Sequence, residues 1–326
     1  MGIAQSVKAA TFRTVAFLRQ SRYSLSLENK QDNLFAPFAA LLAVQASFGS
    51  LPVIGKVVLA VIPAVALVGM RVGITALILF VVQLTRGRIR LKETGDYWRL
   101  AVLSLFGVTF NQLMFITGLS MTKAANASLL AVTIPIFALT IGSLIGVEKL
   151  RPIKFVGIIV AAAGVIFLID PRVASFSSQT TIGDMLIILN SLSYGLYVAT
   201  SKSVVTRNGA FRSIMWIFIF ASIICVPLGA ISISSVDVSA VSTQIWMMVL
   251  YIAVAVTAVP YFLNAWALAR VNPSTVAVFV YLQPLIGFIF AVIFLGETVD
   301  SKFIVAAGLV FIGVFVVTKK YVPSET

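Results

Sequence analysis

Apolar segments long enough to cross a lipid bilayer recur along almost the whole chain, and this pattern constrains the fold more than any motif does. The segments lie at 34–55, 62–84, 98–119, 124–146, 152–169, 181–203, 211–231, 244–268, 272–295 and 300–318. A helix of roughly 20 apolar residues spans a hydrocarbon core of about 30 Å. With 60% hydrophobic and only 11% charged residues, the chain also lacks the charge that a soluble surface needs. The sequence therefore predicts an all-α integral membrane protein with ten transmembrane helices.

The basic residues are unevenly distributed between the expected loops, and this distribution predicts the orientation. If the N-terminus is cytoplasmic, 19 of the 24 Lys and Arg residues lie on the cytoplasmic side. The opposite side then holds Lys56, Lys123, Arg172 and Lys302, and Arg71 lies inside a span. Cytoplasmic loops of membrane proteins are enriched in Lys and Arg. We therefore expect both termini in the cytoplasm, in a bacterial inner membrane rather than an organelle membrane. The net charge of +13 is explained by topology and not by nucleic-acid binding.

The two halves of the chain resemble each other at an offset of 149 residues. Without any gap, the matched pairs include Leu119 with Leu268, Pro135 with Pro284, Glu148 with Glu297, and Gly164 with Gly313. Each half holds five expected spans, an odd number, so the halves must cross the membrane in opposite orientations. Inverted repeats of this kind are common in alternating-access transporters.

The expected organisation follows from this repeat. Residues 34–170 form a first five-helix repeat and residues 181–318 a second one, with a short cytoplasmic tail at 319–326. Residues 1–33 are basic and contain no acid before Glu28. Such a leader can be an organelle transit peptide, but we expect a retained cytoplasmic tail.

Two segments, 127–168 and 274–317, carry a resemblance to a known family. Each contains a mid-span proline, a glutamate about 13 residues later and a following span with glycine. They resemble EamA-type domains of the drug/metabolite transporter superfamily, and Arg71 within GMRVGITALILF resembles the arginine that such domains often carry in their second span. The resemblance implies a ten-helix transporter with a substrate site between the halves. Members carry amino acids, other metabolites, nucleotide sugars or drugs, so the substrate stays open. Phe220 occupies the position equivalent to Arg71, so this charge is not duplicated.

Neutral polar and aromatic side chains fall near the middle of several expected spans. Asn190, Tyr194 and Tyr197 share one helix face by their spacing, and Thr257, Tyr261 and Asn264 repeat that spacing. The candidate substrate-binding set is Gln45, Asn111, Asn190, Tyr194, Tyr197, Thr257, Tyr261, Asn264, Gln283 and Arg71. Any one of these groups could instead bond a neighbouring helix. As a set at one depth, they predict a pocket for a small amphipathic ligand.

Arg71 is the one charge deep inside a span. Such a charge costs at least about 2.5–3.5 kcal/mol on insertion scales, so it must face protein or water rather than lipid. It can bond backbone carbonyls freed by a helix kink, or it can bind an anionic group of the substrate. Pro135, Pro284 and Pro260 are expected to kink their spans, because each removes a backbone donor. These kinks can act as hinges or can only shape the packing.

Chemistry other than transport has little support in the sequence. The chain has no histidine, a single cysteine (Cys225), and no motif for a nucleophile, a metal or a phosphate-binding loop. We therefore expect no catalytic residue, no metal, no cofactor and no enzymatic activity. Small residues form one face at 157–164 and another at 306–313. These faces predict close helix packing, either within the bundle or in a homodimer.

The sequence thus predicts a secondary transporter that moves small neutral or zwitterionic metabolites, with amino acids as the first candidates. Transport would occur by alternating access, as export or exchange. One alternative is a channel-like pore, which the inverted repeat and the lack of charged rings disfavour. The other is a carrier of phosphorylated or nucleotide-linked metabolites, which would need more than one cation inside.

Overall fold

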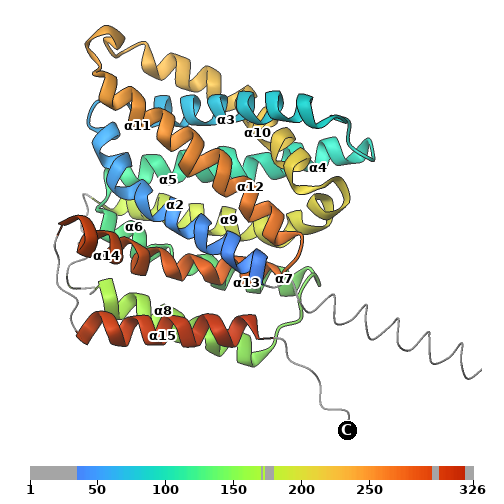
Figure 1. Ribbon diagram of the computed structural model, residues 1–326, viewed down its shortest axis with the longest axis vertical. Coiled ribbons are helices and arrows are strands. Elements are labelled where there is room, and N and C mark those ends of the chain that lie inside the picture. The colour runs from blue at the N-terminus through green and yellow to red at the C-terminus, as the bar shows by residue number, and fades with distance from the viewer. Residues whose placement is uncertain (1–34, 170–171, 173–179, 296–300, 320–326) are drawn as a thin grey trace, which may run out of the picture. The chain divides into compact units, whose positions relative to one another are not determined.

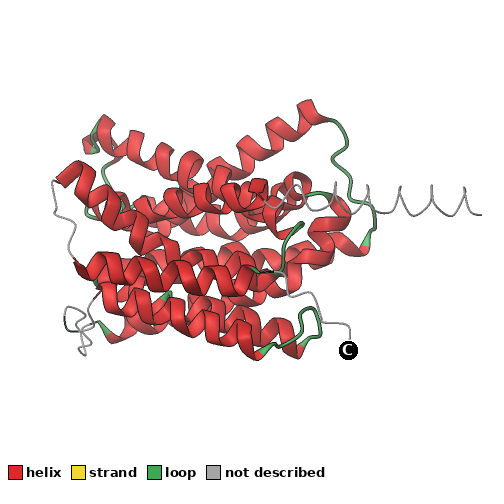
Figure 2. Ribbon diagram, turned by 60° about the horizontal axis from the view of Figure 1, so that its bottom comes forward, coloured by secondary structure: helices red, strands yellow, loops and turns green. Residues whose placement is uncertain are grey.

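The computed structural model is helical throughout the residues that it describes, which are 35–169, 172, 180–295 and 301–319. Figure 2 shows helices joined by loops, with no strand in these ranges. By its internal contacts the chain divides into a unit 1–39 and a unit 40–326. All contacts reported below lie within the second unit. The basic N-terminal tail, Glu297 and the C-terminal tail beyond residue 319 lie outside the described residues.

The helices follow one another in the order that the apolar segments predict. The elements of the first half are α2 (Phe35–Leu59), α3 (Ala64–Arg86), α4 (Gly95–Ser104), the π-helical turn η1 (Leu105–Thr109), α5 (Phe110–Met121), α6 (Ala124–Leu130), α7 (Thr133–Leu144) and α8 (Pro152–Ile169). Those of the second half are α9 (Thr181–Asn208), α10 (Ala210–Ile233), the 3-10 turn η2 (Val238–Ala240), α11 (Thr243–Ala253), the π-helical turn η3 (Val254–Ala258), α12 (Val259–Leu268), α13 (Pro273–Val278), the 3-10 turn η4 (Phe279–Tyr281), α14 (Leu282–Leu295) and α15 (Ser301–Thr318).

Eight of the described helical segments are long and apolar enough to cross a membrane. The all-α integral membrane class is therefore confirmed. The fourth and ninth expected spans contain only shorter apolar helices, Thr133–Leu144 and Pro273–Ile289. A 12-residue helix rises about 18 Å, well short of a hydrocarbon core of about 30 Å. The count of ten complete membrane-spanning helices is not confirmed.

The fourth and ninth expected spans are not continuous helices, because each is interrupted shortly before a proline. Pro135 has no N–H to donate to the carbonyl of Ala131 four residues earlier. Ile134 bonds this carbonyl instead, over three residues and at 3.0 Å, and α6 and α7 are separated there. In the second half, Pro284 lies four residues after Val280 of η4, and η4 separates α13 from α14.

Each half also contains one π-helical turn, and the two lie at the same register of the repeat. η3 begins and ends 149 residues after η1. A π turn disturbs the regular ladder of backbone bonds, and π turns often mark functional sites. Side chains from neighbouring helices bind carbonyls near both turns: Ser193 Oγ donates to the Phe106 carbonyl (2.8 Å), and Thr75 Oγ1 donates to that of Ala253 (2.9 Å). Pro260 lies directly after η3, in the first turn of α12.

Equivalent helices of the two halves pack on each other. α3 packs along α10, and α8 along α15, at the lower edge of the view in Figure 1. Small residues permit the second contact: a Cβ on Gly157 would lie 3.0 Å from the carbonyl oxygen of Gly313, and one on Gly164 2.9 Å from that of Ala306. The small-residue faces, which also include Ala161, are thus buried against each other within the chain. The close packing that these faces predict therefore occurs within the bundle, between α8 and α15, and a homodimer through them is not shown.

Candidate functional site

A polar cavity of about 110 Å³ lies between helices from both halves of the chain. Its lining residues are Gln45, Phe48, Leu51, Arg71, Asn111, Gln112, Phe115, Ala127, Ala131, Ile134, Asn190, Tyr194, Tyr261, Val280 and Gln283. Residues of α2, α3 and α5 thus face residues of α9, α12 and α14. The interruption between α6 and α7 brings Ala131 and Ile134 to the wall as well.

Arg71 is the only charged group among these described lining residues. Its side chain is 1% exposed. Nε donates to Thr257 Oγ1 at 3.0 Å and Nη2 donates to the Val256 carbonyl at 3.4 Å, both within η3. Thr257 Oγ1 in turn donates to the carbonyl of Ile252 at 2.7 Å. Two of the three guanidinium nitrogens therefore hold the π turn of the opposite half.

The third nitrogen, Nη1 of Arg71, is buried and finds no hydrogen-bond partner among the described residues. None of the ion pairs found in these residues involves Arg71 either. A buried donor without a partner is unfavourable by about 1–3 kcal/mol, and more when it is charged. A charged residue with one unsatisfied nitrogen therefore lines the cavity.

Tyr261 is the hydrogen-bonding centre of the cavity wall. Gln112 Nε2 donates to its hydroxyl at 2.9 Å, and the hydroxyl lies 3.2 Å from both Asn111 Oδ1 and the Gly107 carbonyl. Gln112 and Tyr261 occupy equivalent positions, 149 residues apart. Asn190 Nδ2 donates to the Asn111 carbonyl at 2.8 Å, which ties α9 to α5.

Two further side-chain pairs include residues of the polar lining. Gln283 Nε2 donates to Gln45 Oε1 at 2.7 Å and connects α14 to α2. Asn264 Nδ2 donates to the hydroxyl of Tyr194 at 2.6 Å. Oδ1 of Asn264 is buried and has no partner within the described part of the chain.

The structure brings seven of the ten predicted site residues to the cavity. Tyr197, Thr257 and Asn264 do not line it. Tyr197 packs its ring over Gly107, where a Cβ would meet it at 2.8 Å or less. Thr257 accepts a hydrogen bond from Arg71, and Asn264 donates one to Tyr194, which does line the cavity. The other lining residues, among them Gln112, Phe48 and Phe115, were not predicted as site residues from the sequence. Gln112 could have been found, because the repeat aligns it with Tyr261.

The buried carboxylates of the described residues, Asp96, Glu148 and Asp184, lie in polar clusters at helix ends rather than in this cavity. Glu148 accepts from the backbone N–H of Ser274 (3.1 Å) and from its hydroxyl (2.5 Å), and it pairs with Lys154. This cluster joins the end of α7 and the start of α8 to the N-terminus of α13. Asp184 accepts from Thr122 Oγ1 (2.6 Å) and Asn126 Nδ2 (3.0 Å).

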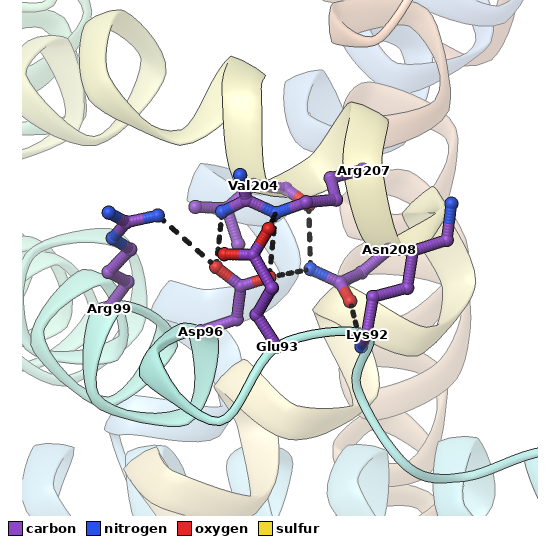
Figure 3. A network of polar contacts seen from close by, with 7 residues as sticks. All are labelled: Lys92, Glu93, Asp96, Arg99, Val204, Arg207 and Asn208. Carbon is purple, nitrogen blue, oxygen red and sulfur yellow. Dashed lines mark hydrogen bonds and ion pairs between the residues drawn. The ribbon is translucent and has the colours of Figure 1, made fainter.

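Asp96 lies at the centre of the polar cluster shown in Figure 3. Its carboxylate is fully buried at the start of α4 and accepts from Arg207 Nε (2.8 Å), from Arg207 Nη2 and from Asn208 Nδ2 (2.7 Å). Asn208 Oδ1 accepts from the backbone N–H of Lys92 at 2.9 Å. Arg99 and Glu93 reach the cluster from its exposed side, at 3.4 Å and 3.5 Å. The cluster fixes the loop before α4 to the end of α9.

The chain matches the model of the EamA-like transporter family in two stretches, residues 35–170 and 181–319. This chain belongs to the EamA-like transporter family. The resemblance to the drug/metabolite transporter superfamily is thereby confirmed. Together with the apolar helices, membership makes the protein a membrane transporter that resides in a lipid bilayer and binds a small molecule.

Several relatives of known sequence agree with this assignment. An uncharacterized transporter of Archaeoglobus fulgidus is 28% identical over 70% of this chain and 79% of its own length. The uncharacterized transporter YetK of Bacillus subtilis is 25% identical over 91% of each chain. The threonine/homoserine exporter RhtA of Salmonella typhimurium is 28% identical over 48% of this chain and 51% of its own. Relatives named as transporters point to a role other than enzymatic catalysis.

A solved crystal structure has the same fold. It superposes with a TM-score of 0.72 at 17% identity, over 87% of this chain and 96% of that one. Within the described residues, no cluster of His, Cys, Asp and Glu could hold a metal ion.

Proposed function

We propose that this EamA-family member is a secondary transporter of small zwitterionic metabolites, with amino acids as its first candidate substrates. The observation that carries the proposal is that Arg71 lines a cavity whose other described lining residues are neutral, while its Nη1 has no hydrogen-bond partner among the described residues. A carboxylate would supply the missing partner, and charge-assisted bonds from guanidinium to carboxylate are stronger than neutral ones.

The other lining groups fit the rest of such a ligand. Amide oxygens of Gln45 and Asn111 can accept from an ammonium group, and the rings of Phe48, Tyr194 and Tyr261 offer apolar and aromatic faces. One cation suits one carboxylate and leaves a phosphorylated or nucleotide-linked substrate poorly neutralised. The relative RhtA is named as a threonine/homoserine exporter, and both of these compounds are amino acids, which supports the same class.

Alternating access is the mechanism that the repeat supports best. In our proposal the two halves, 34–170 and 181–318, insert in opposite orientations with both termini cytoplasmic, in a bacterial inner membrane. The cavity draws residues from both halves, so it lies where their relative movement would change access. The interruptions before Pro135 and Pro284, and the π turn before Pro260, are the proposed hinges. The Glu148–Ser274 bonds join the halves at one end and would have to break when that end opens.

Counterflow in liposomes tests the proposal. Purified protein is reconstituted into vesicles loaded with an excess of one unlabelled amino acid, and the same radiolabelled amino acid is added outside. We expect transient accumulation of label above equilibrium, saturating with external concentration, because a carrier exchanges one bound ligand for another. Protein-free vesicles are the control. Uptake that neither saturates nor overshoots would instead indicate a channel-like pore. Counterflow of phosphorylated metabolites alone would overturn the assignment of the substrate.

A further inference from the structure

A second cavity, of about 350 Å³, adjoins the polar one. The two share three lining residues, Ala131, Val280 and Gln283. The bond between Gln283 and Gln45 stands at this shared wall. The two cavities are therefore neighbouring compartments of one region and not unrelated surface features.

The second cavity differs from the first in chemistry. Its wall comes from α2, α8 and α14 and includes Val165, Leu168 and Phe288. Among its described lining residues none is charged, and only Tyr281 and Gln283 carry polar side chains. The Tyr281 hydroxyl is already satisfied, because it donates to the Val132 carbonyl at 2.8 Å. A polar ligand would find few hydrogen-bond partners in this cavity. An apolar group would leave the hydrogen bond of Tyr281 intact.

Size supports a ligand that uses both compartments. Pockets for small molecules commonly measure about 300–1,000 Å³, and the polar cavity of about 110 Å³ is below this range. It can hold a carboxylate and an amine but little more. The adjoining cavity, which Arg71 does not line, supplies the missing space.

We propose that the apolar cavity receives the side chain of the substrate, so that the carried metabolites are α-amino acids with apolar side chains. This inference rests on the proposed function and adds to it the substrate class and a residue that sets specificity. Arg71 and the polar cavity hold the zwitterionic head, and Val165, Val280 and Phe288 surround the apolar tail. The Gln45–Gln283 pair forms the border between the two parts.

Gly287 is the residue at which this division can be tested. It lines the apolar cavity, and a Cβ added there meets no atom within 4 Å. Gly287→Leu would therefore fill the cavity without a clash at the backbone. Gly308 of α15 is a matched control, because its Cβ position is equally open and it is exposed, away from both cavities.

The experiment is counterflow of radiolabelled alanine, competed by unlabelled alanine, valine, leucine and phenylalanine. In the natural protein leucine should compete at least about tenfold better than alanine, because each added methylene gains apolar contact. In Gly287→Leu this preference should disappear, with leucine weakened about tenfold or more and alanine changed less than about threefold. Gly287→Ala should be intermediate, and Gly308→Leu should behave as the natural protein does.

The other outcomes are distinguishable. Equal weakening of alanine and leucine in Gly287→Leu would overturn the inference and make the cavity a passage. Unchanged competition in Gly287→Leu would also overturn the inference, and it would mean that the apolar cavity holds a lipid chain or no ligand at all. Transport of alanine without any preference for larger side chains would overturn the inference alone. Failure of every amino acid to show counterflow in the natural protein would overturn the proposed function itself.

Discussion

Replacing Asp96 by alanine should lower the free energy of unfolding by about 2–4 kcal/mol. The carboxylate is fully buried and carries three short bonds from Arg207 and Asn208, so its loss leaves a guanidinium and an amide without their partner. Breaking a buried pair typically costs 3–5 kcal/mol, and an exposed one less than about 1 kcal/mol. The Arg207 side chain is 29% exposed, which places the expectation between these limits. Thermal melting of the purified protein in detergent measures the effect.

Glu93→Ala is the matched control for this prediction. Glu93 contacts the same Arg207, at 3.5 Å, but its side chain is 55% exposed. We expect a loss of less than about 1 kcal/mol. The double variant Asp96→Ala with Arg207→Ala should be less destabilised than the sum of the two single variants, since neither charge then remains unpaired. Equal and small effects of Asp96→Ala and Glu93→Ala would contradict a structural role for the buried cluster.

Replacing Arg71 by methionine should weaken binding of amino acids by about 10- to 150-fold. This range corresponds to the loss of a hydrogen bond to a charged group, about 1.5–3 kcal/mol. Methionine keeps the unbranched apolar stem but removes the cation. Decarboxylated amines with the same side chains should bind both proteins alike, because they lack the group that Arg71 would contact. Competition against a radiolabelled amino acid measures both affinities.

The control must separate ligand binding from the second role of Arg71, since two of its nitrogens hold the turn η3. Thr75→Val removes another side-chain bond to the same region, the one to the Ala253 carbonyl, and Thr75 does not line the polar cavity. We expect this variant to lose about 1 kcal/mol of stability and to keep its affinity. If Thr75→Val reproduces the loss of binding, or if the amines lose affinity as well, Arg71 acts only through η3.

Much of the fold could be predicted from the sequence, because a bilayer demands long apolar helices and the chain shows them directly. The repeat also placed polar residues of both halves near one depth, and Asn111, Asn190 and Tyr261 do line one cavity. The continuity of the helices could not be predicted. Pro135 indicated that the carbonyl of Ala131 would lose its usual partner, but not that α6 would end at Leu130 and a separate helix α7 begin at Thr133.

The direction of individual side chains and the contacts between residues far apart in the chain could not be predicted from the sequence either. Thr257 and Tyr261 lie on one helix face by spacing, yet the π turn between α11 and α12 directs Thr257 to Arg71 and Tyr261 to Gln112. No sequence signal marks a π turn. The burial of Asp96 was equally hidden, since its main partner Arg207 lies 111 residues away and only the tertiary fold brings them together. Arg71 left two interpretations open: Nε and Nη2 make the structural contacts, and a contact between Nη1 and the substrate stays a prediction.

The most direct test of the account is an experimental structure of the protein with a transported amino acid bound. We predict a carboxylate oxygen within about 2.7–3.2 Å of Nη1 of Arg71, with the side chain directed past Gln45 and Gln283. An amino acid bound outside the polar cavity, or bound inside it with the carboxylate turned away from Arg71, would contradict it.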